Sequence, residues 1–221
     1  MKARRLVMIL FFTCTLLNAC YTSLQPITTP ETIIDDDRIV ATWESRNGTF
    51  RVEKFFSSGY YRQLKQNGAR FTLNDSTYLK KHYIISREEN DFEYVWAAGI
   101  VRINNEEYTN LFPADCLDKN NLSIYPTNGH ESLQTYSIAK LQWTGNNKIG
   151  IQMMNGDLIK QLTLSEKIRI KYESDPLFGM FLITASSEEL QKFIAKYGKD
   201  KKLYSAREFL LTRNQRSYGS K

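Results

Sequence analysis

The chain has 221 residues, of which 30 are basic and 24 are acidic, so its formal net charge is +6. Three of the basic residues fall within the first five positions, and without residues 1–19 the net charge is +3. A charge this small, with no arginine-rich stripe, argues against nucleic acid as a partner. About 200 residues can bury one full core and fit one domain.

The N-terminus is typical of a secretory leader. Basic residues at positions 2, 4 and 5 are followed by an unbroken apolar or neutral run over residues 6–17, as in a signal peptide. This run has 12 residues, whereas a membrane-spanning helix needs about 20. We therefore expect residues 1–19 to be a signal peptide rather than a lasting transmembrane anchor.

Residues Leu17-Asn18-Ala19-Cys20 close this leader and resemble the lipobox of bacterial lipoproteins. The resemblance implies that the leader is cut just before Cys20 and that this cysteine is acylated, which anchors the protein in the cell envelope. Tyr21 then stands in the second position, and by resemblance to the sorting rule of enteric bacteria it favours the outer membrane, facing the periplasm. The alternative is an ordinary secretory signal with a chance cysteine near its end.

Cysteine usage excludes an internal disulfide in the mature chain. Cys14 leaves with the leader and Cys20 is consumed by lipid, so Cys116 is the one remaining thiol. Only two histidines are present to activate it, and we interpret Cys116 as a small buried apolar residue rather than a nucleophile. The sequence contains no metal-binding or phosphate-binding motif, so we expect no metal and no cofactor.

Residues 20–37 predict a lipidated tether, because the segment contains Pro26, Pro30 and little apolar periodicity. At roughly 3.3 Å per extended residue, it would place the domain up to about 50 Å from the membrane. The run Asp35-Asp36-Asp37 lacks the alternating spacing of a calcium loop. We interpret it as solvated charge.

Residues 38–213 predict one mainly β domain, α+β at its C-terminal end, followed by a basic tail at 214–221. Short segments rich in aromatic and β-branched residues, separated by turn signals, favour an antiparallel barrel or lipocalin-like fold of about ten strands. Asn47-Gly48 and Asn67-Gly68 each predict a type I′ hairpin turn. The strands are expected at 39–45, 49–56, 60–65, 69–73, 81–87, 92–103, 108–112, 133–143, 148–154, 168–173, 180–184 and 208–212.

Two short helices interrupt the predicted strands. Asp157 is suited to cap the first, and Ser186 with Glu189 predicts a capping box that opens the second. Apolar residues in the second helix recur at helical spacing up to Gly198, which indicates packing against the sheet rather than a partner-binding face. The cleanest strand pattern is the alternation of Ile168, Ile170 and Tyr172 with Arg169, Lys171 and Glu173.

Ala41-Thr42-Trp43-Glu44 resembles the opening of lipocalin-like domains, although the usual glycine two residues before the tryptophan is Ala41 here. More of the chain resembles a family of small uncharacterised bacterial proteins, often lipoproteins. The matching pieces are Val40 to Trp43, Leu111-Phe112-Pro113, residues 133–141 and residues 182–193. The resemblance implies a single β-rich domain and carries over no functional residue.

No nucleophile elbow, zinc-protease helix or paired-cysteine motif is present. We interpret His82 and His130 as surface or hydrogen-bonded histidines, and the pairs Glu88-Glu89 and Glu106-Glu107 as solvated charges at turns. Residues 114–131 lack periodicity, and a loop of that length is a candidate for recognition.

Aromatic residues crowd into the first half of the domain. Neighbouring aromatics on a strand point to opposite faces, so Phe55 with Phe56, and Tyr60 with Tyr61, are candidate ligand or partner contacts; the alternative is a second buried face under the helices. We therefore expect a lipid-anchored envelope protein that acts as a noncatalytic binding or assembly module for an envelope protein, lipid or glycan. The alternative is an envelope hydrolase with a histidine-containing cleft.

Overall fold

The computed structural model describes residues 22–89, 92–118, 124–125, 135–175, 177 and 180–214. Cys20, Tyr21, His130 and nearly all of the expected recognition loop after Asp118 lie outside these residues. The part of that loop from Ala114 to Asp118 belongs to a strand instead, and Ile124–Tyr125 forms the short strand β8 that pairs with it.

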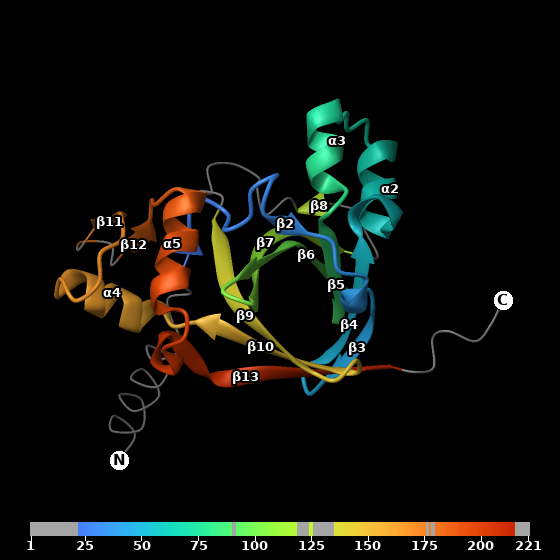
Figure 1. Ribbon diagram of the computed structural model, residues 1–221. Coiled ribbons are helices and arrows are strands. Elements are labelled where there is room, and N and C mark those ends of the chain that lie inside the picture. Colours follow the sequence, from blue (N-terminus) through green and yellow to red (C-terminus); the bar gives the residue numbers. More distant parts are fainter. Residues whose placement is uncertain are drawn as a thin grey trace, which may run out of the picture.

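Eight antiparallel strands close into a barrel, which confirms the predicted fold class (Figure 1). Each strand pairs with the next along the chain, apart from small insertions, and the last pairs with the first. The barrel strands are β3 (Ala41–Ser45), β4 (Gly48–Lys54), β5 (Tyr83–Glu89), β6 (Phe92–Ile103), β7 (Glu106–Asp118), β9 (Tyr136–Thr144), β10 (Lys148–Met154) and β13 (Tyr204–Arg213).

The remaining elements lie outside the barrel wall (Figure 1). The short strands are β1 (Thr22–Ser23), β2 (Ile33–Ile34), β11 (Tyr172–Asp175) and β12 (Met180–Ile183). The helices are α2 (Gly59–Gln66), α3 (Leu73–Leu79), α4 (Gly156–Leu164) and α5 (Ser187–Tyr197). Single 3₁₀ turns are η1 (Asp37–Ile39), η2 (Phe55–Ser57) and η3 (Lys201–Leu203).

The interior of the barrel holds one apolar cluster. Alternate residues of each strand point inward, and Trp43, Tyr83, Ile100 and Ile149 are at most 1% exposed at its centre. Trp43 donates its indole N–H to the carbonyl of Ile39 in η1 at 2.8 Å. This contact seats η1 against the end of the barrel where β3 begins.

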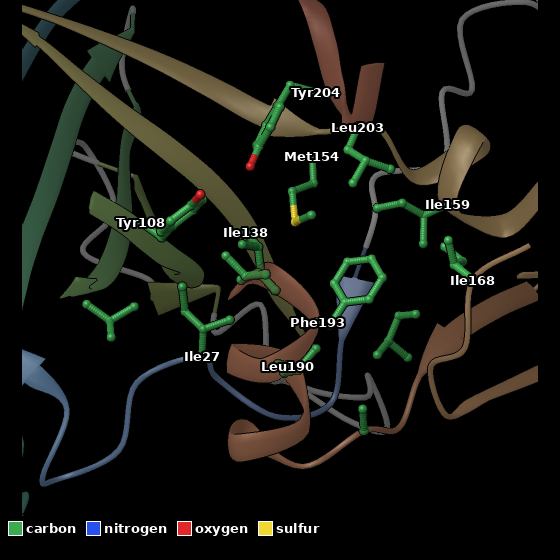
Figure 2. Close-up of a cluster of buried hydrophobic side chains, with 14 residues drawn as sticks. Ile27, Tyr108, Ile138, Met154, Ile159, Ile168, Leu190, Phe193, Leu203 and Tyr204 are labelled. Atoms are coloured by element: carbon green, nitrogen blue, oxygen red, sulfur yellow. The ribbon is translucent and has the colours of Figure 1, made fainter. Parts of the chain in front are cut away.

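The outer face of the barrel is buried in two places. One cluster joins Tyr108 and Ile138 of the wall to Leu190 and Phe193 of α5 (Figure 2). The other joins Ile84 and Val95 of the wall to side chains from η2, α2 and α3. Two separate faces of the barrel are therefore covered by helices.

The Asn-Gly pairs form other turns than predicted. β3 and β4 do form a hairpin, but Ser45 pairs with Gly48 and only the glycine has a positive φ, at 113°. The turn with two positive φ angles is Asn104-Asn105, at 50° and 64°, between β6 and β7. That pair of angles characterises a type I′ turn.

The predicted hairpin around Asn67-Gly68 is wrong, because residues 60–65 lie in α2. Ser58 accepts a hydrogen bond from the Tyr61 N–H and so caps this helix. Gly68, with φ of 85°, ends it: its N–H reaches the Lys65 carbonyl and the Ala69 N–H reaches the Leu64 carbonyl. This is a Schellman motif, in which glycine supplies the left-handed residue.

The predicted capping box is confirmed in α5, where Ser186 and Glu189 exchange backbone and side-chain hydrogen bonds. In α4 the capping residue is Asn155 rather than Asp157. The expected strand at 168–173 begins only at Tyr172. Ile168 and Ile170 still pack into the α5 cluster. The N–H groups of Lys167 and Ile168 reach the Leu162 carbonyl, so the segment starts in the turn that ends α4 rather than in a strand.

Residues 22–37 do not form a free tether. Ser23, Ile27, Thr28 and Ile33 are at most 2% exposed. The Gln191 side chain of α5 donates to the carbonyl of Ile27 at 2.7 Å. β1 also pairs with β9 and β12, and β2 pairs with β6. The segment is therefore part of the folded body, because its few apolar residues find partners far away in sequence.

Candidate functional site

The inward face of β6 changes from solvated to buried along the strand. Its inward positions are Phe92, Tyr94, Trp96, Ala98 and Ile100, as their pairing with β5 shows. Phe92 is 38% exposed, whereas Ala98 and Ile100 are 1% and 0% exposed. Tyr94 and Trp96 are half-buried. Solvent therefore reaches the inner face of the barrel from the end where β6 begins.

The same gradient occurs on other strands. On β13, the inward residue Leu211 is 7% exposed and the next inward residue, Phe209, is 36% exposed. On β10, Ile149 is buried and the next inward residue, Ile151, is half-buried. The inward residues of β4 and β5 follow the same order. The gradient is therefore a property of the whole barrel, with one closed end at η1 and one open end.

The open end has an aromatic inner surface. The rings of Tyr94 and Trp96 stack with centroids 6.2 Å apart and planes inclined by 22°. Arg87 lies over the ring of Phe50 at 5.7 Å and forms an ion pair with Glu89 at 2.9 Å. Half-exposed rings on a fixed wall offer apolar area for stacking at a low entropy cost. We define these inward residues, Phe50, Phe92, Tyr94, Trp96 and Phe209, as the rim aromatics.

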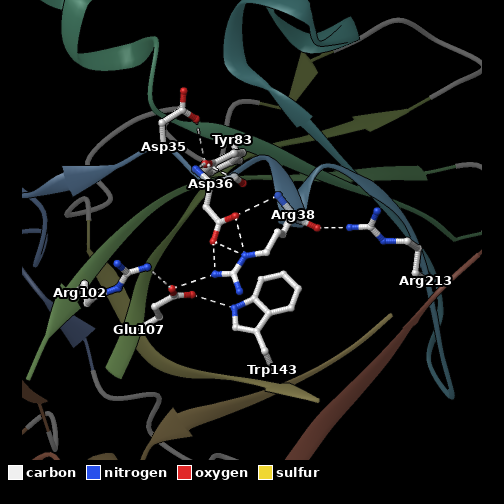
Figure 3. Close-up of polar contacts among 8 residues, drawn as sticks. All are labelled: Asp35, Asp36, Arg38, Tyr83, Arg102, Glu107, Trp143 and Arg213. Atoms are coloured by element: carbon white, nitrogen blue, oxygen red, sulfur yellow. Dashed lines mark hydrogen bonds and ion pairs between the residues drawn. The ribbon is translucent and has the colours of Figure 1, made fainter. Parts of the chain in front are cut away.

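A polar network seals the closed end (Figure 3). Glu107 is 8% exposed and accepts hydrogen bonds from Arg38 at 3.0 Å, Arg102 at 2.7 Å and the Trp143 indole at 2.8 Å. Arg38 also lies 4.6 Å above the Trp143 ring and binds Asp36 through Nε and Nη2. This network fastens η1 to β6, β7 and β9.

Neighbouring contacts continue the network around η1. The hydroxyl of Tyr83 accepts the N–H of Asp36 at 2.6 Å and donates to Asp35 at 3.2 Å. Burial is the main reason that the pKa of Tyr83 rises to about 12. Arg213 donates to the carbonyl of Arg38 and lies 5.1 Å above the Trp43 ring. Asp36 is thus held against the barrel, whereas Asp35 and Asp37 are exposed as predicted, each within an ion pair with Lys54.

The network contains acids and bases, but each carboxylate is already held by a cation. Burial raises the pKa of Asp36, yet the hydrogen bonds and charge of Arg38 outweigh burial, so this pKa lies below its ordinary value. The hydrogen bonds that the Arg38 guanidinium donates to Asp36 are the main cause that raises the pKa of Arg38. Paired in this way, neither side chain is poised to exchange protons near neutral pH. The network therefore closes this end of the barrel and has a structural role.

The histidine and thiol candidates do not assemble into a catalytic group within the described residues. His82 is 7% exposed, and its Nδ1 lies 3.1 Å from the carbonyl of Tyr78. Burial lowers the pKa of His82. His130 lies outside the described residues, and of Cys116 only the backbone, in β7, is described.

The four predicted contact residues do not form a strand platform. Phe55 and Phe56 lie in η2, and Tyr60 and Tyr61 lie in α2. Phe55 is 5% exposed, and its ring centroid is 5.2 Å from that of Phe56 and 5.6 Å from that of Tyr61. They pack on one another and on the barrel wall, which matches the alternative of a buried face under helices. The rule for neighbouring residues on strands does not apply to them.

The two glutamate pairs differ from each other. Glu88 and Glu89, at the end of β5, are exposed as predicted. Glu106 is partly exposed and accepts hydrogen bonds from Lys140 at 2.7 Å and Tyr108 at 2.9 Å, whereas Glu107 is buried and belongs to the closed-end network. The tight Asn104-Asn105 turn places them at the start of a strand rather than in a loop.

Sequence reasoning did not select the rim aromatics. The signal was present in β6, where Phe92, Tyr94 and Trp96 occupy every second position. Period-two spacing puts them on one face. The adjacent pair Phe55-Phe56 has no such spacing and lies in the 3₁₀ turn η2. Phe50 and Phe209 give no such signal, because neither has an aromatic residue two positions away on its own strand.

Comparison with known proteins found no matching family model, no matching curated protein and no matching solved structure. Within the described residues, no helix combines the length and apolar character needed to cross a bilayer.

Proposed function

We propose that the protein is a noncatalytic binding module of the bacterial envelope, held at the membrane by lipid on Cys20. The exposure gradient inside the barrel is the observation that carries the binding role. A barrel that is closed by the Glu107 network at one end and carries half-exposed rings at the other offers apolar surface to a ligand at that second end. The leader and lipobox pattern support the envelope location.

The chemistry of the rim favours an apolar ring or chain as the ligand. Phe92 and Phe209 are 38% and 36% exposed although both face inward. Covering such surface contributes about 25 cal/mol per Å² of apolar area. The charge of Arg87, which lies over Phe50, is balanced by Glu89, although its Nε has no hydrogen-bond partner within the described residues.

The hydrolase alternative has less support. Within the described residues, His82 is directed to a backbone carbonyl rather than to a carboxylate, and the carboxylates of the closed end are held by arginines. General acid–base catalysis needs a group whose proton is free to move near the working pH. The described part of the chain does not bring such a group to the rim.

Titration with the neutral fluorescent probe N-phenyl-1-naphthylamine tests the binding role. The chain from residue 21 to residue 221 contains every described element and is used without detergent. Phe209 and Leu210 form a matched pair, since they are neighbours on β13, are 36% and 53% exposed, and face opposite sides of the wall. We expect Phe209→Ala to weaken probe binding about tenfold, as truncation of an aromatic anchor does, and Leu210→Ala to leave it unchanged.

The same titration has a clear contrary outcome. Equal effects of Phe209→Ala and Leu210→Ala, or no saturable binding to the unmodified chain, would contradict a site at the rim.

The location of the protein at the membrane is tested separately. We expect Cys20→Ser to abolish acyl-chain labelling and release the protein from the membrane fraction, whereas unchanged labelling and partition would exclude the lipid anchor.

A further inference from the structure

A groove of about 880 Å³ lies outside the barrel, between α5 and the chain that runs from the end of α4 to β11. Its lining carries five basic side chains. Lys167, Arg169 and Lys171 come from the chain between α4 and β11, and Lys192 and Lys196 come from α5. Two acidic residues, Glu166 and Glu189, also line it. We refer to it as the basic groove.

The local structure explains why these charges gather. Ile168 and Ile170 turn toward the α5 cluster, so the residues between and beside them, Lys167, Arg169 and Lys171, are left exposed. In α5 the buried face carries Leu190, Phe193 and Ile194. Lys192 and Lys196 are four residues apart and therefore share one side of the helix. Two elements thus place cations on facing walls.

Most of this positive charge is not neutralised. Lys171 forms an ion pair with Glu189 at 2.8 Å. Among the described residues, Lys167, Arg169, Lys192 and Lys196 have no carboxylate oxygen within 4 Å, although Lys192 attracts Glu188 and Glu189 over a longer distance. The Lys196 ammonium lies over the ring of Tyr197 at 4.8 Å. Like charges on facing walls repel one another, and a bound anion would relieve this repulsion.

The second observation is an orphan hydroxyl. Thr163, at the end of α4, lines the basic groove and is 5% exposed. Its Oγ1 has no hydrogen-bond partner in the part of the chain that the structure describes. A buried polar atom without a partner costs about 1–3 kcal/mol. The hydroxyl oxygen has less than 1 Å² of accessible surface, so a ligand oxygen in the groove supplies the missing partner only when the Thr163 side chain rotates toward it.

We propose that the basic groove is a binding site for a phosphate-bearing molecule. A phosphate monoester carries a charge of about −1.5 to −2 at pH 7 and three strong acceptor oxygens, which suits several cations and a hydroxyl donor. Arg169, Lys192 and Lys196 supply the charge, and the Thr163 hydroxyl donates to a phosphate oxygen. Tyr172 and Phe193, which also line the groove, provide apolar contact for the rest of the molecule. This site is separate from the rim aromatics and does not depend on the proposed barrel ligand.

The first test is calorimetric titration of residues 21–221 with inorganic pyrophosphate. The double variant Arg169→Gln/Lys192→Gln removes two charges from the groove. Its matched control, Lys65→Gln/Lys148→Gln, removes two charges at exposed positions of α2 and β10. We expect the first to weaken binding at least tenfold and the control less than twofold. Equal effects, or no saturable binding to the unmodified chain, would overturn the proposal.

A second variant tests the hydroxyl without changing the charge. Thr163→Val preserves the shape of the side chain and removes the unpaired oxygen, so we expect the thermal midpoint to stay the same or rise while pyrophosphate binding weakens several-fold. Unchanged affinity would contradict the assigned role of Thr163. An unchanged or higher thermal midpoint would show that a loss of affinity does not come from loss of folding.

Vesicles distinguish the two sources of phosphate. One set contains only phosphatidylcholine, and the other contains phosphatidylcholine and phosphatidylglycerol in a 7:3 ratio. Selective binding to the anionic vesicles, displaced by pyrophosphate and lost in Arg169→Gln/Lys192→Gln, would assign the groove to a lipid headgroup. Pyrophosphate binding without vesicle binding would assign it to a soluble phosphate ester. Vesicle binding that survives the double variant would contradict the proposal.

Discussion

Glu107 of β7 accepts a hydrogen bond from the indole of Trp143 in β9 at 2.8 Å, at the sealed end of the barrel. Its other carboxylate oxygen accepts hydrogen bonds from the guanidinium groups of Arg38 and Arg102. One carboxylate therefore joins η1 to three strands. A group that neutralises two arginines while 8% exposed is expected to contribute more to stability than a surface ion pair.

Glu107→Gln tests this contribution. The amide keeps the volume of the side chain but removes the charge that both arginines face, so we expect the free energy of unfolding to fall by about 1.5–3 kcal/mol. Urea unfolding followed by tryptophan fluorescence measures it. Glu173→Gln, on the exposed edge strand β11, is the control and should stay within about 0.5 kcal/mol. A similarly small effect at Glu107 would mean that the carboxylate is solvated after all.

Ile27→Ala tests whether residues 22–37 belong to the folded body. Ile27 is 0% exposed, and truncation of a buried isoleucine costs about 2–5 kcal/mol. Leu177, at 91% exposure, provides the control, since Leu177→Ala also removes a branched side chain but creates no cavity. The thermal midpoint should fall by many degrees only for Ile27→Ala. Equal midpoints for the two variants would restore the interpretation of a tether.

Phe55→Ala separates a packing role from a ligand role. Because Phe55 is 5% exposed and contacts Phe56, Tyr61 and Phe71, we expect a loss of about 3–5 kcal/mol in stability. Binding of N-phenyl-1-naphthylamine, measured where the variant remains folded, should be unchanged. Reduced probe binding at full stability would place the ligand site at η2 rather than at the rim.

His82 should make stability depend on pH in a mildly acidic range. Burial lowers its folded-state pKa below the ordinary value of 6.5. The unfolded chain therefore binds more protons at this histidine, and stability falls as the pH drops from about 6.5 toward the folded-state pKa. His82→Gln removes the titrating group. Urea unfolding at pH 7.5, 6.5 and 5.5 should show a smaller decline for the variant, and parallel declines would contradict the assignment.

The sequence alone determined the features that depend on neighbouring residues. The alternation of aromatic and β-branched residues predicts the barrel class and matches the bounds of β6 and β10, Phe92–Ile103 and Lys148–Met154. The capping box of Ser186 and Glu189 marks the start of α5. The capping box spans four residues and a strand pattern fewer than fifteen, so the information that specifies them is local.

Tertiary structure decided which faces are buried and what each end of the barrel does. Thr28 hydrogen-bonds Asn110, and Gln191 hydrogen-bonds Ile27, so contacts distant in sequence turn the expected tether into part of the body. Alternation divides a strand into two faces without saying which is enclosed, and here helices cover parts of the outer face while the inner face opens at one end. The rim aromatics and the basic groove exist only because closure of the barrel and docking of α5 bring separate segments together.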